Sequence, residues 1–196
     1  MNKSRAPKIP PILHLGQFVL CCLEKAKLFN EFFAKQCTNI VNDSILPEFS
    51  FLTDKRIDNF MIHDNDILTL IRNLNPKKAV GADCISGQML LLCDESVVFP
   101  LKIIFTNILK SGIYPDSWKL ANVVPIHKKE DKQLIKNYRP ISLLPICGKV
   151  FEKLIFDSLY SYLHSNELIT TNQSGFRPGD STTNQLLFLI NEIQIP

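Results

Sequence analysis

The chain has 196 residues, of which 45% are hydrophobic and 21% are charged, and its formal net charge at pH 7 is +3. This length holds one or two domains, and the apolar content is ample for a core, which argues against a disordered or low-complexity chain. The small positive charge permits binding to nucleic acid without arguing for it.

The N-terminal stretch has some features of a targeting signal. Lys3, Arg5 and Lys8 precede an uncharged run over residues 9–23. This run is interrupted by two prolines, no small-residue cleavage site follows it, and it is too short to span a bilayer. The six cysteines show neither a CxxC pair nor a zinc-like spacing with the four histidines, which predicts reduced thiols. We therefore expect an intracellular protein, cytoplasmic or nuclear, that is not secreted and has no membrane partner.

Most of the chain has the periodicity of amphipathic helices. Apolar residues recur at three-to-four spacing, or fill short apolar helices, over residues 23–41, 65–74, 87–93, 97–110, 150–164 and 181–193. Asp64, Ser86 and Ser181 are expected to cap the helices that follow them, and Gly112 fits a C-terminal cap. A loop is expected from residue 42 to about residue 63.

Residues 122–149, NVVPIHKKEDKQLIKNYRPISLLPICGK, predict a β-hairpin with basic residues at both shoulders. Two apolar runs flank a charged loop that is too polar to be buried. Pro125 and Pro140 cannot donate to a sheet ladder, which indicates an edge ribbon that projects. The hairpin would bring Lys128 close to Arg139, and a lysine beside an arginine suits a polyphosphate. The alternative for these two residues is a solvated charged turn.

A second motif, QSGFRPGDSTTNQ, covers residues 173–185. Gly175 allows tight backbone geometry, Phe176 can stack or pack, and Arg177 can reach a phosphate. The alternative is a helix-entry turn in which Arg177 is merely exposed.

The strings PIHKK, KNYRPISLL, GKVFEKLI and QSGFRPGDSTTNQLL together resemble the reverse transcriptases of non-LTR (LINE-type) retrotransposons, in particular the jockey and CR1-like branch. The resemblance covers roughly residues 24–193. It implies an α/β fold, mostly helical with a small antiparallel β-hairpin, that forms the fingers part of a right-hand polymerase with an incomplete palm. Residues 1–63 would be a linker region with one amphipathic helix, and residues 64–196 the N-terminal fingers part.

The resemblance also implies ligands and site residues. Lys128 and Arg139 would contact the triphosphate of a dNTP, and Gly175, Phe176 and Arg177 would lie near the template. The implied partners are RNA or an RNA/DNA hybrid, the dNTP and the missing palm segment. The basic loop NPKKAVGADCIS, residues 75–86, is expected either near template phosphates or as a connector between helices.

Nucleotidyl transfer by a polymerase needs two metal ions that are held by carboxylates. Reverse transcriptases supply these carboxylates from an FLDxxKAFD-like motif and a YADD-like turn, and neither string occurs in this sequence. We therefore expect no catalytic residue, metal ligand or cofactor in this chain, with Mg²⁺ needed only by the complete polymerase. The sequence predicts a truncated reverse transcriptase domain that is inactive alone. The alternative is a non-enzymatic remnant that binds RNA or another protein.

Overall fold

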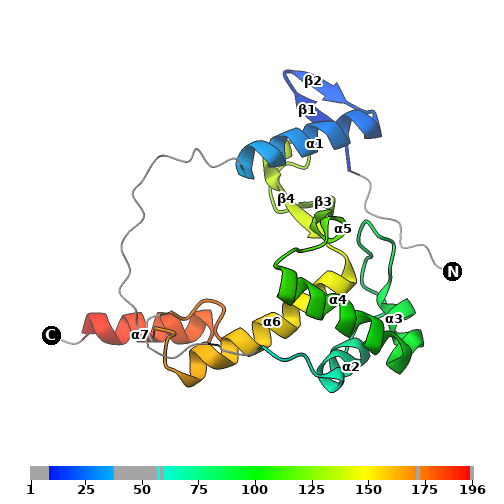
Figure 1. Cartoon of the computed structure of the whole chain (residues 1–196). Helices are drawn as coiled ribbons and strands as arrows, with labels where there is room; N and C mark the ends of the chain where they lie inside the picture. The colour runs from blue at the N-terminus through cyan, green and yellow to red at the C-terminus, as the bar shows by residue number, and fades with distance from the viewer. Residues whose placement is uncertain (1–8, 38–56, 58–59, 171–172, 195–196) are drawn as a thin grey trace. The chain divides into compact units, whose positions relative to one another are not determined.

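The computed structural model describes residues 9–37, 57, 60–170 and 173–194 (Figure 1). The chain divides into two units. The first unit contains the described residues 9–37 and 62–152, and the second contains residues 57, 60–61 and the described residues 153–194. The described residues are mostly helical and form two separate two-stranded antiparallel sheets. The expected class is confirmed at this level, although the sequence predicted only one hairpin. The division at residues 63 and 64 stays a prediction.

The hairpin that the sequence did not predict lies near the N-terminus. Strands β1 (Ile12–His14) and β2 (Gln17–Val19) pair antiparallel, with Ile12 opposite Val19. The two turn residues both have positive φ, 49° at Leu15 and 79° at Gly16. Two consecutive left-handed residues give the turn type that matches the right-handed twist of a hairpin.

Helix α1 (Cys22–Cys37) confirms the predicted helix over residues 23–37, and residues 38–41 lie outside the described part of the chain, as does most of the predicted loop 42–63. Its aromatic side packs in a cluster with the first strand and with Tyr138, a residue far along the sequence. The rings of Phe29 and Tyr138 meet edge to face, with centroids 4.9 Å apart. This contact fixes α1 to the later hairpin.

A helical layer follows in the first unit. It consists of α2 (Asp64–Arg72), α3 (Gly87–Cys93), the 3-10 turn η1 (Asp94–Val97) and α4 (Val98–Ser111). Two of its predicted caps are confirmed. Ser86 Oγ accepts a hydrogen bond from the Met89 N–H at 3.1 Å, and Gly112 has the left-handed conformation with φ 68°. The buried side chains of α2 and α4 include Ile67, Ile71 and Phe105.

The predicted cap at Asp64 is wrong. The N-cap position of α2 is His63, whose side chain makes no capping hydrogen bond. Asp64 lies in the first helical turn and forms an ion pair with Lys102, with 2.7 Å between Asp64 Oδ1 and Lys102 Nζ. A carboxylate in a first turn is still favourable because it faces the positive end of the helix dipole. Asp64 therefore indicated the start of the helix correctly, but the cap position is the residue before it.

The short helix α5 (Asp116–Lys119) leads into the predicted hairpin, which consists of β3 (Asn122–His127) and β4 (Tyr138–Leu143). The register places Pro125 opposite Pro140, so neither proline removes a bond that the other strand needs. A 3-10 turn, η2 (Ile135–Asn137), closes the loop between the strands.

Helix α6 (Ile146–Ser165) begins four residues earlier than predicted, directly after Pro145. Its first part, up to Glu152, belongs to the first unit, where the Phe151 ring packs 5.2 Å from the Phe105 ring. The start of α6 lies against the loop that precedes α3, because a Cβ at Gly81 would be 2.6 Å from the Pro145 nitrogen. Only glycine allows the two backbones to approach this closely.

The second unit consists mainly of the rest of α6 and of α7 (Thr182–Gln194), which a loop joins. The predicted cap of α7 is confirmed, since Ser181 Oγ accepts a hydrogen bond from the Asn184 N–H at 3.2 Å. Among the described residues, no helix combines the length and apolar content that a membrane crossing requires.

Candidate nucleic-acid interface

The β3–β4 hairpin places Lys128 and Arg139 on the same face of the ribbon. Arg139 is directly opposite Ile126, and the Lys128 N–H donates to the Asn137 carbonyl at 2.8 Å, which extends the ladder by one step beyond the strands. Side chains two residues apart point to the same face. Lys128 and Arg139 are thus diagonal neighbours, which usually lie about 7–8 Å apart, with a somewhat shorter distance between their Cβ atoms. Both side chains are exposed.

The loop between the strands is held by its own hydrogen bonds. The Asp131 carboxylate accepts from the Gln133 N–H at 2.9 Å, and the Asp131 carbonyl accepts from the amide of the buried Asn137, also at 2.9 Å. The Tyr138 hydroxyl donates to the Lys132 carbonyl at 2.7 Å. These bonds fix the base of the loop, so that its lysines extend from an ordered frame.

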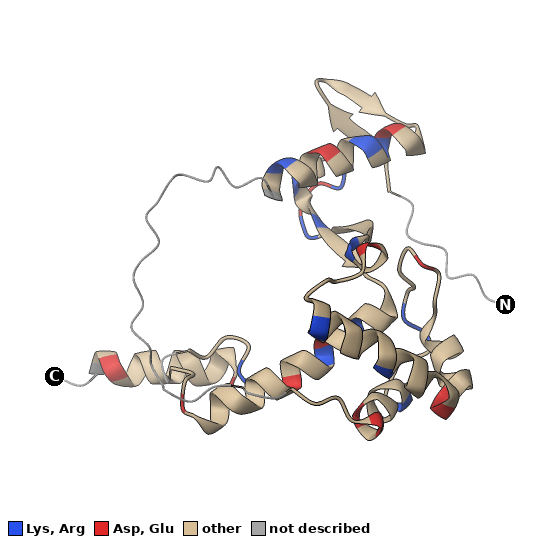
Figure 2. Ribbon diagram, in the orientation of Figure 1, with Lys and Arg blue, Asp and Glu red and all other residues tan. Residues whose placement is uncertain are grey.

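Several Lys and Arg positions lie on this hairpin and its loop (Figure 2). The exposed basic residues of the hairpin and its loop are Lys128, Lys129, Lys132, Lys136 and Arg139. In the part of the chain that the structure describes, none of them forms an ion pair within 4.0 Å. The hairpin therefore presents cations whose charge no described carboxylate neutralises at contact distance.

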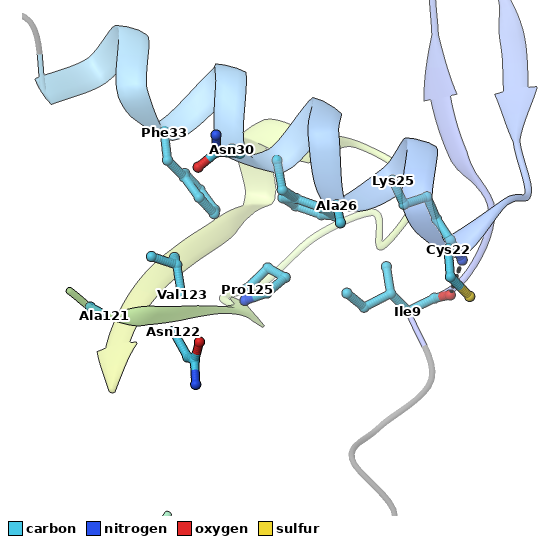
Figure 3. A pocket seen from close by; sticks show the side chains of 11 residues that line it. Ile9, Cys22, Lys25, Ala26, Asn30, Phe33, Ala121, Asn122, Val123 and Pro125 are labelled. Atoms are coloured by element: carbon cyan, nitrogen blue, oxygen red, sulfur yellow. Dashed lines mark hydrogen bonds between the residues drawn. The ribbon is translucent and has the colours of Figure 1, made fainter. Parts of the chain in front are cut away.

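The other face of the ribbon does not project freely, contrary to the prediction of a projecting edge. Alternation along the strands sends Tyr138 to the side opposite Arg139, where the buried tyrosine ring packs against Phe29 of α1. A groove of about 590 Å³ separates α1 from β3, and Val123 and Pro125 line it on the β3 side (Figure 3). The sequence could not indicate this cover, because the contact joins segments far apart in the chain.

The same groove is lined by a buried lysine that was not expected from the sequence. Lys25 on α1 is only 9% exposed, and its Nζ donates to the Ile9 carbonyl at 2.8 Å and the Pro10 carbonyl at 3.4 Å (Figure 3). These bonds tie the segment that leads into β1 to α1. A lysine in an amphipathic helix normally indicates a solvent-facing position, so the burial of Lys25 could not be predicted from its residue type.

The basic loop over residues 75–86 connects α2 to α3. Its Asn75 side chain accepts from the Lys77 N–H at 2.9 Å, and Asp83 Oδ1 accepts from the Ile85 N–H at 3.2 Å. The second oxygen of Asp83 is buried and has no hydrogen-bond partner among the residues that the structure describes. The connector role of this loop is visible in the structure, and its proximity to template phosphates stays a prediction.

Residues Gly175, Phe176 and Arg177 lie in the loop that precedes α7, in the second unit. Phe176 has a positive φ of 62° and its ring is fully exposed. Arg177 Nη1 donates to the Thr170 carbonyl at 3.5 Å. Hydrogen bonds from Ser174 and from the Ser181 N–H hold the pKa of the nearby Asp180 below its usual value.

The residue types that commonly bind metal ions are not clustered in the described part of the chain. Among the described residues, no three His, Cys, Asp or Glu side chains form a group that could hold a metal ion.

The comparisons with known proteins agree with these motifs. No protein-family model matches the chain. The chain is 34% identical over 127 residues to the RNA-directed DNA polymerase from mobile element jockey of Drosophila melanogaster. It is 32% identical over 133 residues to a probable RNA-directed DNA polymerase from transposon BS, and 33% identical over 125 residues to one from transposon X-element, both of the same organism.

These matches cover 64%, 67% and 63% of this chain, in that order, but only 14%, 15% and 14% of the three relatives. The chain therefore spans a small part of the length of the curated proteins that it matches. The resemblance seen in the sequence motifs is confirmed: over about two thirds of its length, this chain is homologous to the RNA-directed DNA polymerases of jockey, BS and X-element, which are non-LTR retrotransposons.

Proposed function

We propose that this chain is the fingers portion of a non-LTR reverse transcriptase and that its β3–β4 hairpin holds the triphosphate of an incoming dNTP. Lys128 and Arg139 would bind the phosphates, while residues 175–177 would border the RNA template. The observation that carries this proposal is the placement of an exposed lysine and an exposed arginine as diagonal neighbours on one face of a hairpin.

The chemistry of these two side chains supports a polyphosphate ligand. An arginine presents a planar fork that can bind two phosphate oxygens at once, and a lysine adds a compact charge that can follow a second phosphate. The opposite face of the ribbon is fixed against α1 through Tyr138 and Phe29. A charged pair on a fixed support loses less conformational entropy when it binds a ligand than a pair on a free loop does.

The alternative proposal is a non-enzymatic module that binds RNA or another protein. The exposed cations of the hairpin favour the RNA-binding form of this alternative. Salt dependence separates the two forms, because phosphate contacts release counterions and weaken steeply as salt rises.

The hairpin is tested by a double substitution. We expect Lys128→Ala with Arg139→Ala to weaken binding of a labelled single-stranded RNA, measured by fluorescence anisotropy across a salt series. Loss of two phosphate contacts should reduce the slope of log affinity against log salt by about 1.4. An unlabelled dNTP should compete with the RNA on the wild-type chain and compete poorly on the variant.

The matched control is Lys27→Ala with Lys110→Ala, which removes the same charge from two exposed positions outside the hairpin. We expect this control to retain the wild-type salt slope. Equal affinities of the hairpin variant and the control would refute the role of the hairpin.

We also propose that the chain does not polymerise DNA on its own. The carboxylate motifs that hold the two Mg²⁺ ions in the family do not occur in the 196 residues, so we assign the metal-dependent step to the complete polymerase. The purified chain should not extend a DNA primer on an RNA template in Mg²⁺ or Mn²⁺. Extension above that of a boiled sample would show that the chain contains a metal site of another kind.

A further inference from the structure

The groove between α1 and β3 has the size and lining of a site for a small apolar molecule. Its volume of about 590 Å³ lies within the range of about 300–1,000 Å³ that is usual for ligand sites. Apolar side chains line both of its walls: Ala26, Phe29 and Phe33 from α1, and Val123 and Pro125 from β3. Figure 3 shows Phe33 and Val123 facing each other across the groove.

The two walls of the groove are fixed to each other. The ring of Phe29 on α1 meets the ring of Tyr138 on β4, and β4 pairs with β3 along its whole length. The groove is therefore present before any ligand binds. Closely packed protein interiors leave few voids larger than a water molecule, so a volume of this size between fixed elements has room for a ligand.

The groove is separate from the proposed triphosphate site. Side chains alternate along a strand, so Val123 and Pro125 lie on the face of the ribbon opposite Lys128 and Arg139. Val123 is 46% exposed although it lines the groove, which leaves apolar surface open to a ligand.

Lys25 supplies a buried positive charge at one end of this groove. Its Nζ donates to the carbonyls of Ile9 and Pro10, and an ammonium group has three donors, so one N–H remains. Among the described residues, no carboxylate lies within 4.0 Å of Lys25. Burying a charge is costly unless a counter-charge accompanies it. An anionic group on a ligand would neutralise this charge.

We propose that the groove binds an apolar monocarboxylate, such as a medium-chain fatty acid. Its carboxylate pairs with Lys25, and its chain lies along α1 toward Phe33 and Val123. The helix rises about 12 Å between Lys25 and Phe33, which sets the length of chain that the groove accepts. One lysine balances one negative charge, which favours a carboxylate over a doubly charged phosphate. This site goes beyond the proposed function and does not rest on it.

The test is isothermal titration calorimetry of the full chain with decanoate, whose extended chain is of about this length, and with the uncharged decanol. We expect the wild type to bind decanoate about 10- to 100-fold more tightly than decanol, because a hydrogen bond to a charged group is added. In Lys25→Met, which keeps an unbranched apolar side chain, the two ligands should bind alike. Lys27→Met changes an exposed lysine of the same helix and should keep the wild-type difference.

A second pair of variants locates the ligand without changing any charge. Val123→Trp fills the groove from an exposed strand position and should abolish measurable binding of decanoate. The matched control is Ile126→Trp, which changes a residue of the same strand that is 43% exposed on the other face and should bind decanoate like the wild type.

Three results would overturn the proposal. They are no binding of decanoate to the wild type, equal affinities of the wild type for decanoate and decanol, and unchanged binding of decanoate in Val123→Trp. The last result would place the acid on another apolar surface, such as the exposed side chains of α7. If Lys25→Met does not fold, the two ligands on the wild type and the two β3 variants still decide.

Discussion

The roles of some single residues could be predicted from the sequence, and the roles of others could not. Ser86 and Ser181 could be predicted as caps because a hydroxyl before an apolar helix has one common use. The buried second oxygen of Asp83 could not be predicted, since it depends on the packing of residues 75–86 against the start of α6. The same packing buries the thiol of Cys147.

The buried thiol of Cys147 should make the stability of the protein depend on pH. Burial, together with the negative charge of Asp83, raises the pKa of the thiol from 9.0 to about 11. The folded chain therefore keeps the thiol neutral where the unfolded chain ionises it. The contribution of the neutral, buried thiol to the stability of the fold is complete below pH 9, and it is lost as the pH rises from about 9 to about 11.

We expect the free energy of unfolding to fall over this pH range by about 2–3 kcal/mol more in the wild type than in Cys147→Ala. Urea unfolding of both proteins at several pH values between 8 and 11 measures the difference. The alanine variant also leaves a small cavity, but that cost does not vary with pH. Parallel pH curves for the two proteins would contradict the assignment.

The helices were the most predictable elements. The spacing of apolar residues predicted the positions of α2, α4, α6 and α7 to within a few residues. Helices α2, α4 and α6 each bury part of their apolar side, whereas the apolar residues of α7 are exposed. The β3–β4 hairpin was predictable from its two apolar runs, and so was the approach of Lys128 to Arg139. The burial of Tyr138 on the opposite face was not predictable, because it depends on the contact of this residue with α1.

The β1–β2 hairpin was missed for a local reason. Its turn residues are Leu15 and Gly16, whereas the usual signal for such a turn is Asn-Gly or Asp-Gly. Leucine in a left-handed conformation is strained, and asparagine tolerates that conformation better.

We therefore expect Leu15→Asn to raise the free energy of unfolding by about 0.5–1 kcal/mol. Leu15 is 91% exposed, so no buried contact is lost. Leu20→Asn, at an exposed position with negative φ, serves as the control and should bring no gain. Chemical denaturation of the wild type and of the two variants measures the difference in the free energy of unfolding. A loss of stability in Leu15→Asn would argue against the left-handed turn at residues 15 and 16.

On the scale of the whole molecule, the family could be predicted from long motifs in a fixed order, whereas the division into two units could not. The second unit ends in α7, whose apolar residues are exposed. The exposed apolar residues of α7 are Leu186, Leu187, Phe188, Leu189, Ile190 and Ile193, with exposed fractions between 41% and 82%. An exposed apolar surface of this kind promotes association.

We expect the isolated chain to self-associate and to elute early from a size-exclusion column. Leu186→Lys with Ile193→Lys should shift the elution toward the monomer, because the charges interrupt the apolar surface of α7. Leu92→Lys with Leu120→Lys changes two exposed leucines of the other unit and should leave the elution unchanged. A wild-type chain that elutes as a clean monomer would show that α7 is not a contact surface.

The contact between Phe29 and Tyr138 has a consequence for synthesis of the chain. The tyrosine follows the phenylalanine by about 110 residues, and ribosomes add about 5–20 residues per second. The aromatic side of α1 therefore leaves the ribosome about 5 to 20 s before its partner strand has been made. During that interval Phe29 and Phe33 lack the cover that the finished hairpin provides. Until β4 has been made, these rings are therefore open to contacts with other exposed apolar surfaces, and the early exposure ends only when Tyr138 joins the cluster.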